Sequence, residues 1–384
     1  MLPRVFQAED GKDFLPKFHS RFYLLSLMKY FIPFALLLLS GALFFGSHFF
    51  DTPKTVLWQS GSVSVPWVAK GQIGLDRWVK PPSRLMHNMT DEELFWAASF
   101  TPQVKKYPFN RVPKIAFMFM TRGPLPLAPL WERFFRGGNE GLYSIFVHSL
   151  PSYVANYPTD SVFYKRQIPS QVTEWGTISM CDAERRLLAN ALLDVSNEWF
   201  VLLSETCIPL YNFSIIYAYL KRSDYSFVDS FDNPSPHARG RYNPQMAPLI
   251  DISQWRKGSQ WFEVARELAT HMVQDTKFYA AFKEFCSPPC YVDEHYFPTL
   301  LHIEKPNLIA NRSITFTDWS RGGAHPATFG EADISEEFFR KLLDGHDCFY
   351  NGQHSSVCVL FARKFAPGAL EPLLRLAPAV LGFV

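Results

Sequence analysis

A long apolar segment lies close to the N-terminus. Residues 31–50 read FIPFALLLLSGALFFGSHFF, and no Asp, Glu, Lys or Arg occurs between Lys29 and Asp51. As a helix that rises about 1.5 Å per residue, twenty residues cross the roughly 30 Å hydrocarbon layer of a bilayer. The alternative is a cleaved signal peptide, whose apolar core is usually only about 7–15 residues long and ends at a small-x-small cleavage site. Neither property fits, so the sequence predicts a retained transmembrane signal-anchor at residues 30–50.

The charges beside this segment predict its orientation, because Lys and Arg concentrate on the cytosolic side of membrane helices. Five basic residues precede the segment and only two fall within the twenty residues that follow: Arg4, Lys12, Lys17, Arg21 and Lys29 before it, Lys54 and Lys70 after it. We therefore expect residues 1–29 to form a cytosolic tail and the rest of the chain to be lumenal, as in a single-pass type II membrane protein.

Cysteines and glycosylation sequons agree with a lumenal location. Three sequons, which begin at Asn88, Asn212 and Asn311, follow the anchor. An even number of cysteines suits disulfides in an oxidising compartment, and all six come after the anchor: Cys181, Cys207, Cys286, Cys290, Cys348 and Cys358. Together these features predict a protein of the secretory pathway.

Residues 51–111 are rich in proline and lack sustained periodicity. One helix signal interrupts them, since Thr90 and Glu93 have the spacing of a capping box ahead of an apolar run. We interpret this region as a stem that joins the anchor to the folded domain. The alternative is that it packs on that domain as an N-terminal extension.

From residue 112 onward, short apolar runs alternate with helix-sized spacers, which is typical of βαβ units and a mostly parallel sheet. The predicted strands are 114–121, 142–148, 199–203 and 225–228, and the predicted helices between them are 128–136, a helix capped by Ser179 that runs to Leu192, and 212–221. The later chain is more irregular, with predicted helices at 263–274, 276–285, 293–301 and 335–343. No linker-like break occurs, so we expect one α/β domain over residues 112–384.

Composition and the absence of certain motifs exclude several classes of function. With 47% hydrophobic and 19% charged residues the chain is not disordered, and a net charge of +2 gives no reason to expect nucleic-acid binding. The sequence contains no Gly-x-Ser-x-Gly elbow, no P-loop, no Gly-x-Gly-x-x-Gly after a strand and no Asp-x-Asp pair. A hydrolase elbow and these nucleotide-binding motifs are therefore excluded.

Two clusters of charged residues are candidates for a catalytic or ligand-binding site. Asp293-Glu294-His295 opens a predicted helix, where the simple alternative is that the carboxylates only cap it. Arg363-Lys364 follows a predicted strand at 357–361, where adjacent cations suit a phosphate group or are merely solvated. The set Cys286, Cys290, His295 and His302 has none of the usual zinc spacings, and in a lumen the cysteines pair first.

Several blocks, in order, resemble the core-2/I-branching β-1,6-N-acetylglucosaminyltransferase family, specifically its plant branch of brittle-culm-type proteins. The resemblance spans about residues 114–376, and its blocks are KIAFMFMT (114–121), SMCDAERRLLANALLD (179–194), WFVLLSETCIPLYNF (199–213), WRKGSQWFEVAR (255–266), YVDEHYFPTLL (291–301), DWSRGGAHPA (318–327) and VCVLFARKFAP (357–367).

The resemblance implies a GT-A-like Rossmann-type fold and a Golgi enzyme of type II topology. It implies inverting, metal-independent transfer of a sugar, N-acetylglucosamine as first choice, from a UDP-sugar to a glycan or glycoprotein hydroxyl. The UDP-sugar is a substrate, and no cofactor is expected. Matched to this sequence, the general base is Glu294 and the diphosphate-binding residue is Lys364. Arg241, just before Tyr242, matches the acceptor region, and Gly258-Ser259-Gln260-Trp261 matches a motif of the substrate cleft.

The resemblance also implies a disulfide between Cys348 and Cys358; we further expect the pairs Cys286–Cys290 and Cys181–Cys207. Two positions depart from the animal enzymes: Ser355 replaces an Arg that assists the lysine, so that Arg363 would have to take its place, and His148 replaces an Asp at the end of a strand. These departures leave a rival hypothesis, a catalytically weakened glycan-binding or scaffolding protein for cell-wall or proteoglycan assembly. A glycoside hydrolase normally needs two opposed carboxylates, and the sequence offers one well-placed candidate.

Overall fold

The computed structural model describes residues 79–101 and 106–383. The predicted tail, the anchor at 30–50 and most of the predicted stem lie outside these residues. Within the described residues, none of the helices has the length and apolar character needed to cross a membrane.

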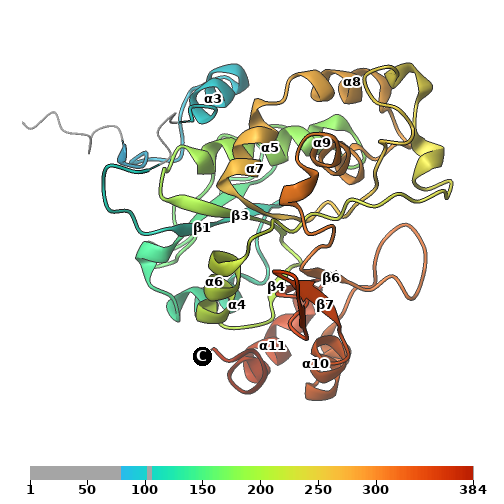
Figure 1. Cartoon of the computed structure of the whole chain (residues 1–384). Helices are drawn as coiled ribbons and strands as arrows, with labels where there is room; N and C mark the ends of the chain where they lie inside the picture. The colour runs from blue at the N-terminus through green and yellow to red at the C-terminus, as the bar shows by residue number, and fades with distance from the viewer. Residues whose placement is uncertain (1–78, 102–105, 384) are drawn as a thin grey trace, which may run out of the picture. The chain divides into compact units, whose positions relative to one another are not determined.

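A four-stranded sheet forms the centre of the domain (Figure 1). Its strands lie in the order β2 (Tyr143–His148), β1 (Lys114–Met120), β3 (Asn197–Ser204) and β5 (Glu263–Ala265). β1 pairs in parallel with both β2 and β3, and the short β5 pairs antiparallel with β3. Because both faces of the sheet are covered, β1 is buried along almost its whole length, which explains its continuous apolar sequence. The prediction of a mostly parallel α/β sheet is therefore confirmed.

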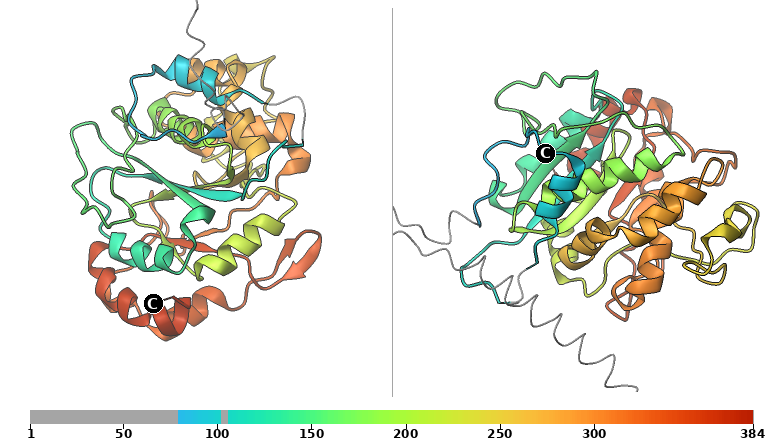
Figure 2. Two further views of the ribbon diagram at one scale, coloured as in Figure 1. Left: turned by 90° about the vertical axis from the view of Figure 1, so that its left-hand side faces the viewer. Right: turned by 90° about the horizontal axis from the view of Figure 1, so that it is seen from above.

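The two faces of the sheet pack against different groups of helices. Side chains alternate along β1, so that Ala116 and Met118 belong to one buried cluster and Phe117 and Phe119 to the other. Figures 1 and 2 show α5 (Ile178–Leu192), α7 (Arg266–Gln274) and α9 (Tyr296–Glu304) over one face, and α4 (Ala128–Arg136), α6 (Phe213–Arg222) and α11 (Leu370–Leu376) under the other.

The C-terminal third adds a small second sheet and a hairpin. The second sheet has the order β4 (Ile208–Pro209), β9 (Phe361–Arg363) and β6 (Thr315–Thr317), and the hairpin joins β7 (Cys348–Tyr350) to β8 (Gln353–Ser355). Two further helices of the described residues are α8 (Lys277–Phe285) and α10 (Glu336–Leu343). Short helical turns lie at Glu140–Leu142, Arg239–Arg241, Pro244–Met246, Val292–Glu294 (η4), Pro306–Leu308, Glu331–Asp333, Pro367–Ala369 and Ala377–Leu381.

Several predicted elements are shifted or wrong. The predicted strand at 225–228 forms only isolated bridges, Ser226 with Ile309 and Phe227 with Glu263. The helix predicted from residue 263 begins at Arg266, because Glu263–Ala265 pairs with the edge of β3. The strand predicted at 357–361 is β9, which starts at Phe361. Ser179 lies inside α5, whose N-cap residue is Thr177, and its hydroxyl accepts a hydrogen bond from the Glu174 backbone instead.

The described part of the predicted stem includes one helix that belongs to the folded domain. α3 (Asp91–Ala98) begins with the predicted capping box between Thr90 and Glu93. It buries Leu94 and Ala98 in the same cluster as α5 and α7, and Arg186 of α5 forms two hydrogen bonds to the carboxylate of Asp91. This helix therefore packs on the domain as an N-terminal extension, which is the alternative left open by the sequence.

Two of the three expected cysteine pairs are disulfides, Cys286–Cys290 and Cys348–Cys358. The expected pair Cys181–Cys207 is wrong, since both thiols are free and buried. The reason is the sheet itself: Cys181 on α5 belongs to the buried cluster on one face, and Cys207 after β3 belongs to the cluster on the other. The Cys286–Cys290 bond also occupies both thiols that were considered as zinc ligands.

The chain approaches itself very closely at Gly258. A Cβ atom at this position would collide with the Asp229 carbonyl oxygen and lie 2.8 Å from Cγ of Pro298. The Gly258 amide donates a hydrogen bond of 2.8 Å to the Glu294 carbonyl, so the segment cannot simply move away.

We expect Gly258→Ala to lower the free energy of unfolding by about 1–3 kcal/mol, because overpacking forces the backbone to shift. Urea unfolding followed by tryptophan fluorescence measures this change. Gly368→Ala is the matched control, since a Cβ at Gly368 meets no atom within 4 Å. Equal stability of the two variants would contradict the close approach.

Candidate active site

The candidate site lies beyond the C-terminal ends of the parallel strands, where open α/β sheets bind their ligands. Arg122 follows β1, Glu205 follows β3, and Lys364 follows β9 of the second sheet. A parallel bridge between Phe329 and Phe365 holds the loop at 318–327 beside this position. Segments far apart in sequence thus bring several charged side chains to one edge.

Glu294, the predicted base, lies in the turn η4 just before α9. Its carboxylate accepts a hydrogen bond of 2.6 Å from Arg241 and forms a second ion pair with Lys257. Burial alone would raise the pKa of Glu294, but the charges of Lys257 and Arg241 outweigh it and lower the pKa below its ordinary value. The carboxylate is therefore ionised at neutral pH and able to accept a proton.

The two residues that flank Glu294 are both internal. Asp293 does not cap α9, whose N-cap residue is His295, so the helix-cap interpretation of Asp293 is wrong. Asp293 is buried with Oδ1 unpartnered, and burial together with Glu294 raises the pKa of Asp293 to about 6. The His295 ring stacks on Trp255 at 4.5 Å and donates from Nδ1 to the Arg256 carbonyl. Burial lowers the pKa of His295 to about 3, so this ring is neutral and enclosed.

Arg241 contacts Glu294, the predicted base, whereas the neighbouring Tyr242 does not bond to it and packs elsewhere in the protein. The Tyr242 hydroxyl donates a hydrogen bond of 2.7 Å to the Ile250 carbonyl, and its ring packs edge-to-face on Trp255. Lys257 is a site residue that the sequence analysis missed. Its position directly before the Gly-Ser-Gln-Trp motif is the one feature of the sequence that pointed to a role of Lys257 in the site.

The predicted cleft motif connects the base to the cation pair Arg363-Lys364. The Ser259 hydroxyl accepts from the Trp261 backbone, and Gln260 donates a hydrogen bond of 2.8 Å to the buried carboxyl of Glu184. The Arg363 guanidinium lies over the Trp261 ring, 4.1 Å from its centre. The Gln260 and Trp261 side chains of this motif therefore contact other protein side chains, Glu184 in one case and Arg363 in the other.

Positive charge gathers around Lys364. The adjacent Arg363 is also half-exposed, with its Nε buried and unpartnered, and desolvation lowers the pKa of Arg363. Burial and the neighbouring Arg363 also lower the pKa of Lys364, which remains half-exposed and able to reach a ligand. Burial and the charges of Lys364, Arg363 and Arg122 likewise lower the pKa of His325. This edge is suited to an anionic group such as a diphosphate.

The two departures from the family pattern have local roles. His148 is buried at the end of β2, where its Nε2 accepts a hydrogen bond of 3.3 Å from the Gln171 backbone. Burial and Arg186 lower the pKa of His148 to about 4, so the ring is neutral. The Ser355 hydroxyl accepts from the Val357 backbone, beside the Cys348–Cys358 disulfide.

Three ring side chains that the sequence analysis did not select, those of Tyr291, Trp175 and His325, form a row of contacts that starts at Arg241. The Arg241 guanidinium lies 4.4 Å from the centre of the Tyr291 ring. Tyr291 in turn contacts Trp175 at 4.8 Å, and Trp175 contacts His325 at 5.1 Å. Nothing in the local sequence predicts this contact, because Trp175 and Tyr291 are 116 positions apart.

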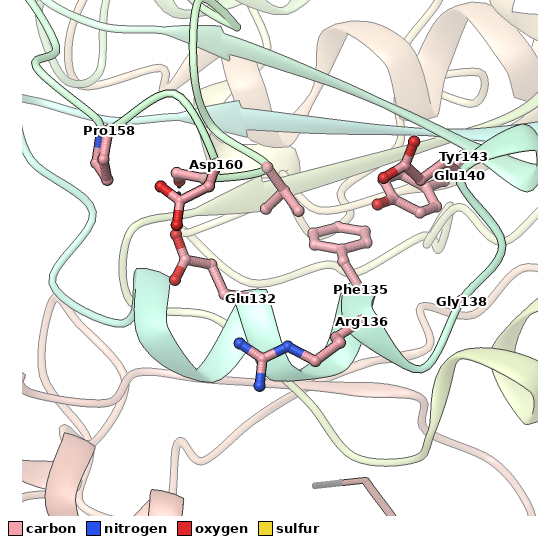
Figure 3. Close-up of a pocket in the computed structure, with 10 residues that line it drawn as sticks. Glu132, Phe135, Arg136, Gly138, Glu140, Tyr143, Pro158 and Asp160 are labelled. Carbon is pink, nitrogen blue, oxygen red and sulfur yellow. Dashed lines mark hydrogen bonds between the residues drawn. The ribbon is translucent and has the colours of Figure 1, made fainter.

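A cavity of about 320 Å³ lies elsewhere, at the opposite end of the strands, where β2 begins and α4 ends (Figure 3). Glu132, Glu140 and Asp160 contribute three carboxylates to its lining. In Figure 3 the carboxylates of Glu132 and Asp160 point toward one another, and Arg136 extends away from them. With three carboxylates and one guanidinium in its lining, this cavity suits a diphosphate less well than the edge around Lys364 does.

The sequons and the possible metal ligands complete the candidate residues. Asn88 and Asn311 are exposed, whereas Asn212 is half-buried and its side chain caps α6. Within residues 79–101 and 106–383, no three His, Cys, Asp or Glu side chains gather closely enough to hold a metal ion.

Comparisons with known proteins identify the class. The family model of the Core-2/I-Branching enzyme matches residues 115–343. Glycosyltransferase BC10 from Oryza sativa subsp. japonica is 37% identical over 309 residues, which cover 69% of this chain and 76% of that protein. The chain therefore belongs to the Core-2/I-Branching enzyme family and is a glycosyltransferase, which confirms the resemblance seen in the sequence.

The buried Asp293 predicts a pH-dependent stability. Its folded pKa of about 6 lies above its ordinary value of 3.8, so the folded state keeps a proton that the unfolded chain loses. Its contribution to stability is present below about pH 4 and is lost as the pH rises through 6. Relative to the wild type, Asp293→Asn should gain up to about 3 kcal/mol over that interval.

Urea unfolding at a series of pH values measures this difference. The variant Asp224→Asn, at an exposed position, is the control and should follow the wild type. If Asp293→Asn showed the same pH profile as the wild type, Asp293 would not be the group that titrates.

Proposed function

We propose that this chain is an inverting, metal-independent transferase of GT-A-like fold in the Golgi membrane. It transfers a sugar, N-acetylglucosamine as first choice, from a UDP-sugar to a hydroxyl of a glycan or glycoprotein. The observation that carries the proposal is the ionised carboxylate of Glu294, held between Arg241 and Lys257 and joined through the segment 258–261 to the cations at 363–364.

In this reaction the acceptor oxygen attacks the anomeric carbon from the face opposite the departing UDP. An alcohol is a weak nucleophile at neutral pH, so a carboxylate must accept its proton as the new bond forms. Glu294 suits this task because Lys257 and Arg241 keep it ionised. The enclosed ring of His295 and the buried carboxyl of Asp293 are poorer candidates, since an acceptor cannot reach them.

The leaving UDP carries the bonding electrons and develops negative charge on its phosphates. Something cationic must meet that charge as the bond to the sugar breaks. Lys364 is half-exposed at the edge where Arg122 and Arg363 also raise the local potential. We propose that Lys364 binds the diphosphate directly. Because the Arg363 guanidinium lies over the Trp261 ring, we propose that it supports Lys364 mainly through its charge.

The proposed Golgi location and type II topology rest on the anchor at 30–50 and on lumenal features of the folded part. The two disulfides support this location, because disulfides persist mainly in oxidising compartments. The exposed Asn88 and Asn311 are accessible to glycosylation. A scaffolding protein of the same compartment is the rival, and turnover of UDP-sugars by the purified chain distinguishes the two.

Glu294→Gln should reduce turnover by about 10²–10⁴-fold, the usual contribution of a general base. Donor affinity should stay nearly unchanged, because this side chain faces the acceptor. Initial rates and UDP titrations of the purified variant measure both. Near-normal turnover in Glu294→Gln, combined with loss of turnover in Asp293→Asn or His295→Ala, would reassign the base.

Lys364→Ala should weaken UDP binding and lower turnover, because it removes the half-exposed cation nearest to the developing phosphate charge. EDTA should leave the wild-type rate unchanged. Lys277→Ala, at an exposed position of α8, is the control and should behave as the wild type. Complete loss of transfer in EDTA that manganese restores would overturn the metal-independent mechanism.

A further inference from the structure

We propose that Trp175 is the stacking platform for the acceptor sugar, an assignment that rests on the function proposed above. Trp175 is 49% exposed, although its ring lies next to Tyr291 and His325. A continuous set of contacts leads from this ring to the base: Trp175 to Tyr291, Tyr291 to Arg241, and Arg241 to Glu294.

The turn that carries Trp175 is held to the start of α5 by two hydrogen bonds. The Glu174 amide donates a hydrogen bond of 2.8 Å to the Ser179 hydroxyl, and the Thr177 hydroxyl donates one of 2.9 Å to the Glu174 carbonyl. Gly176 has φ of 78°, a conformation that favours glycine, and a Cβ there would lie only 3.1 Å from the Tyr291 ring. The indole is therefore presented on an ordered turn at the start of α5.

A half-exposed, ordered indole that is connected through Tyr291 and Arg241 to the proposed catalytic carboxylate suits a pyranose ring. One face of a pyranose presents C–H groups that pack against an aromatic face, while the hydroxyls at its rim stay free to form hydrogen bonds. Rigid aromatic anchors also bind at low entropic cost, because little conformational freedom is lost.

The contacts of Trp175 favour the acceptor sugar over the donor sugar. Trp175 is joined through Tyr291 and Arg241 to Glu294, the group that must touch the acceptor hydroxyl. Trp175 also contacts His325, and the charges of Lys364 and Arg122, where the donor diphosphate would be held, act on the His325 ring. The platform is thus connected by contacts to the proposed base and to the proposed donor cations, as the site of the attacking sugar must be.

The test uses the full-length chain, purified in a detergent without a sugar head group. Three variants are compared with the wild type: Trp175→Ala, Trp175→Phe and Trp96→Ala. Trp96 is 68% exposed on α3, where it contacts Phe100 and no residue of the candidate site, so its loss controls for removal of an exposed indole. Binding is read on an array of gluco-, galacto- and xylo-oligosaccharides and of N- and O-linked glycans. Hydrolysis of UDP-GlcNAc, UDP-GalNAc, UDP-Glc, UDP-Gal and UDP-Xyl is measured in parallel.

Trp175→Ala should lower glycan binding by roughly 10-fold or more, the loss expected from one aromatic contact of this size. Trp175→Phe should restore most of the binding, Trp96→Ala should match the wild type, and donor hydrolysis should be unchanged in all three variants. The proposal is overturned if Trp175→Ala binds glycans normally, if it loses donor hydrolysis in parallel, or if the wild type binds none of the glycans.

These readouts separate the platform from the proposed function. Glycan binding that depends on Trp175, with neither hydrolysis of any UDP-sugar nor sugar transfer to any bound glycan by the wild type, would contradict the transferase reaction and keep Trp175 as a glycan-binding residue. If the wild type hydrolysed a UDP-sugar but bound glycans equally well without Trp175, the transferase proposal would stand and the role of Trp175 would be rejected.

Discussion

The crossing of three chain segments at Gly258 determines how the candidate site is assembled. The missing side chain lets the backbone lie against Asp229 and Pro298, while its amide bonds the Glu294 carbonyl. On one side of this crossing Lys257 reaches the Glu294 carboxylate. On the other side Trp261 supports Arg363, next to the proposed phosphate-binding lysine. A close backbone contact therefore connects the segment of the proposed base to the segment that supports the proposed phosphate-binding lysine.

Beneath this crossing lies a group of buried polar side chains that a stable core would normally exclude. Glu184 and Asp293 are buried carboxyls, and each has one oxygen without a partner; Nε of Arg363 is also unpartnered. Desolvation raises the pKa of both acids, well above the usual range for Glu184, so burial favours their neutral forms. Buried groups of this kind lower stability unless they are paired. Asp293 precedes Glu294, Glu184 bonds Gln260, and Arg363 lies over Trp261, so this cost in stability falls at the candidate site.

The sheet explains why the site lies at one edge. Parallel strands all end at the same side, so the loops after β1 and β3 meet there. The two apolar clusters on either face are independent of this edge and supply the stability that it lacks. The acidic cavity at the other end of the strands has the wrong charge for a nucleotide, and the difference between the two ends is thus electrostatic as well as topological.

Local patterns in the sequence predicted much of the fold and the centre of the site. The apolar runs of β1, β2 and β3, the face of α5 and the capping box at Thr90 depend on residues close together in the chain, and each is present. The family blocks also identified the chain's class and selected Glu294 and Lys364 as candidates.

What the sequence did not reveal depends on pairings between distant segments. β5 formed because the edge of β3 was available, and Cys181 stays free because the sheet separates it from Cys207. Lys257 and Trp175 join the site through contacts with residues 37 and 116 positions away. No local propensity reports such contacts, because they exist only once both buried clusters have packed and brought the loops to one edge.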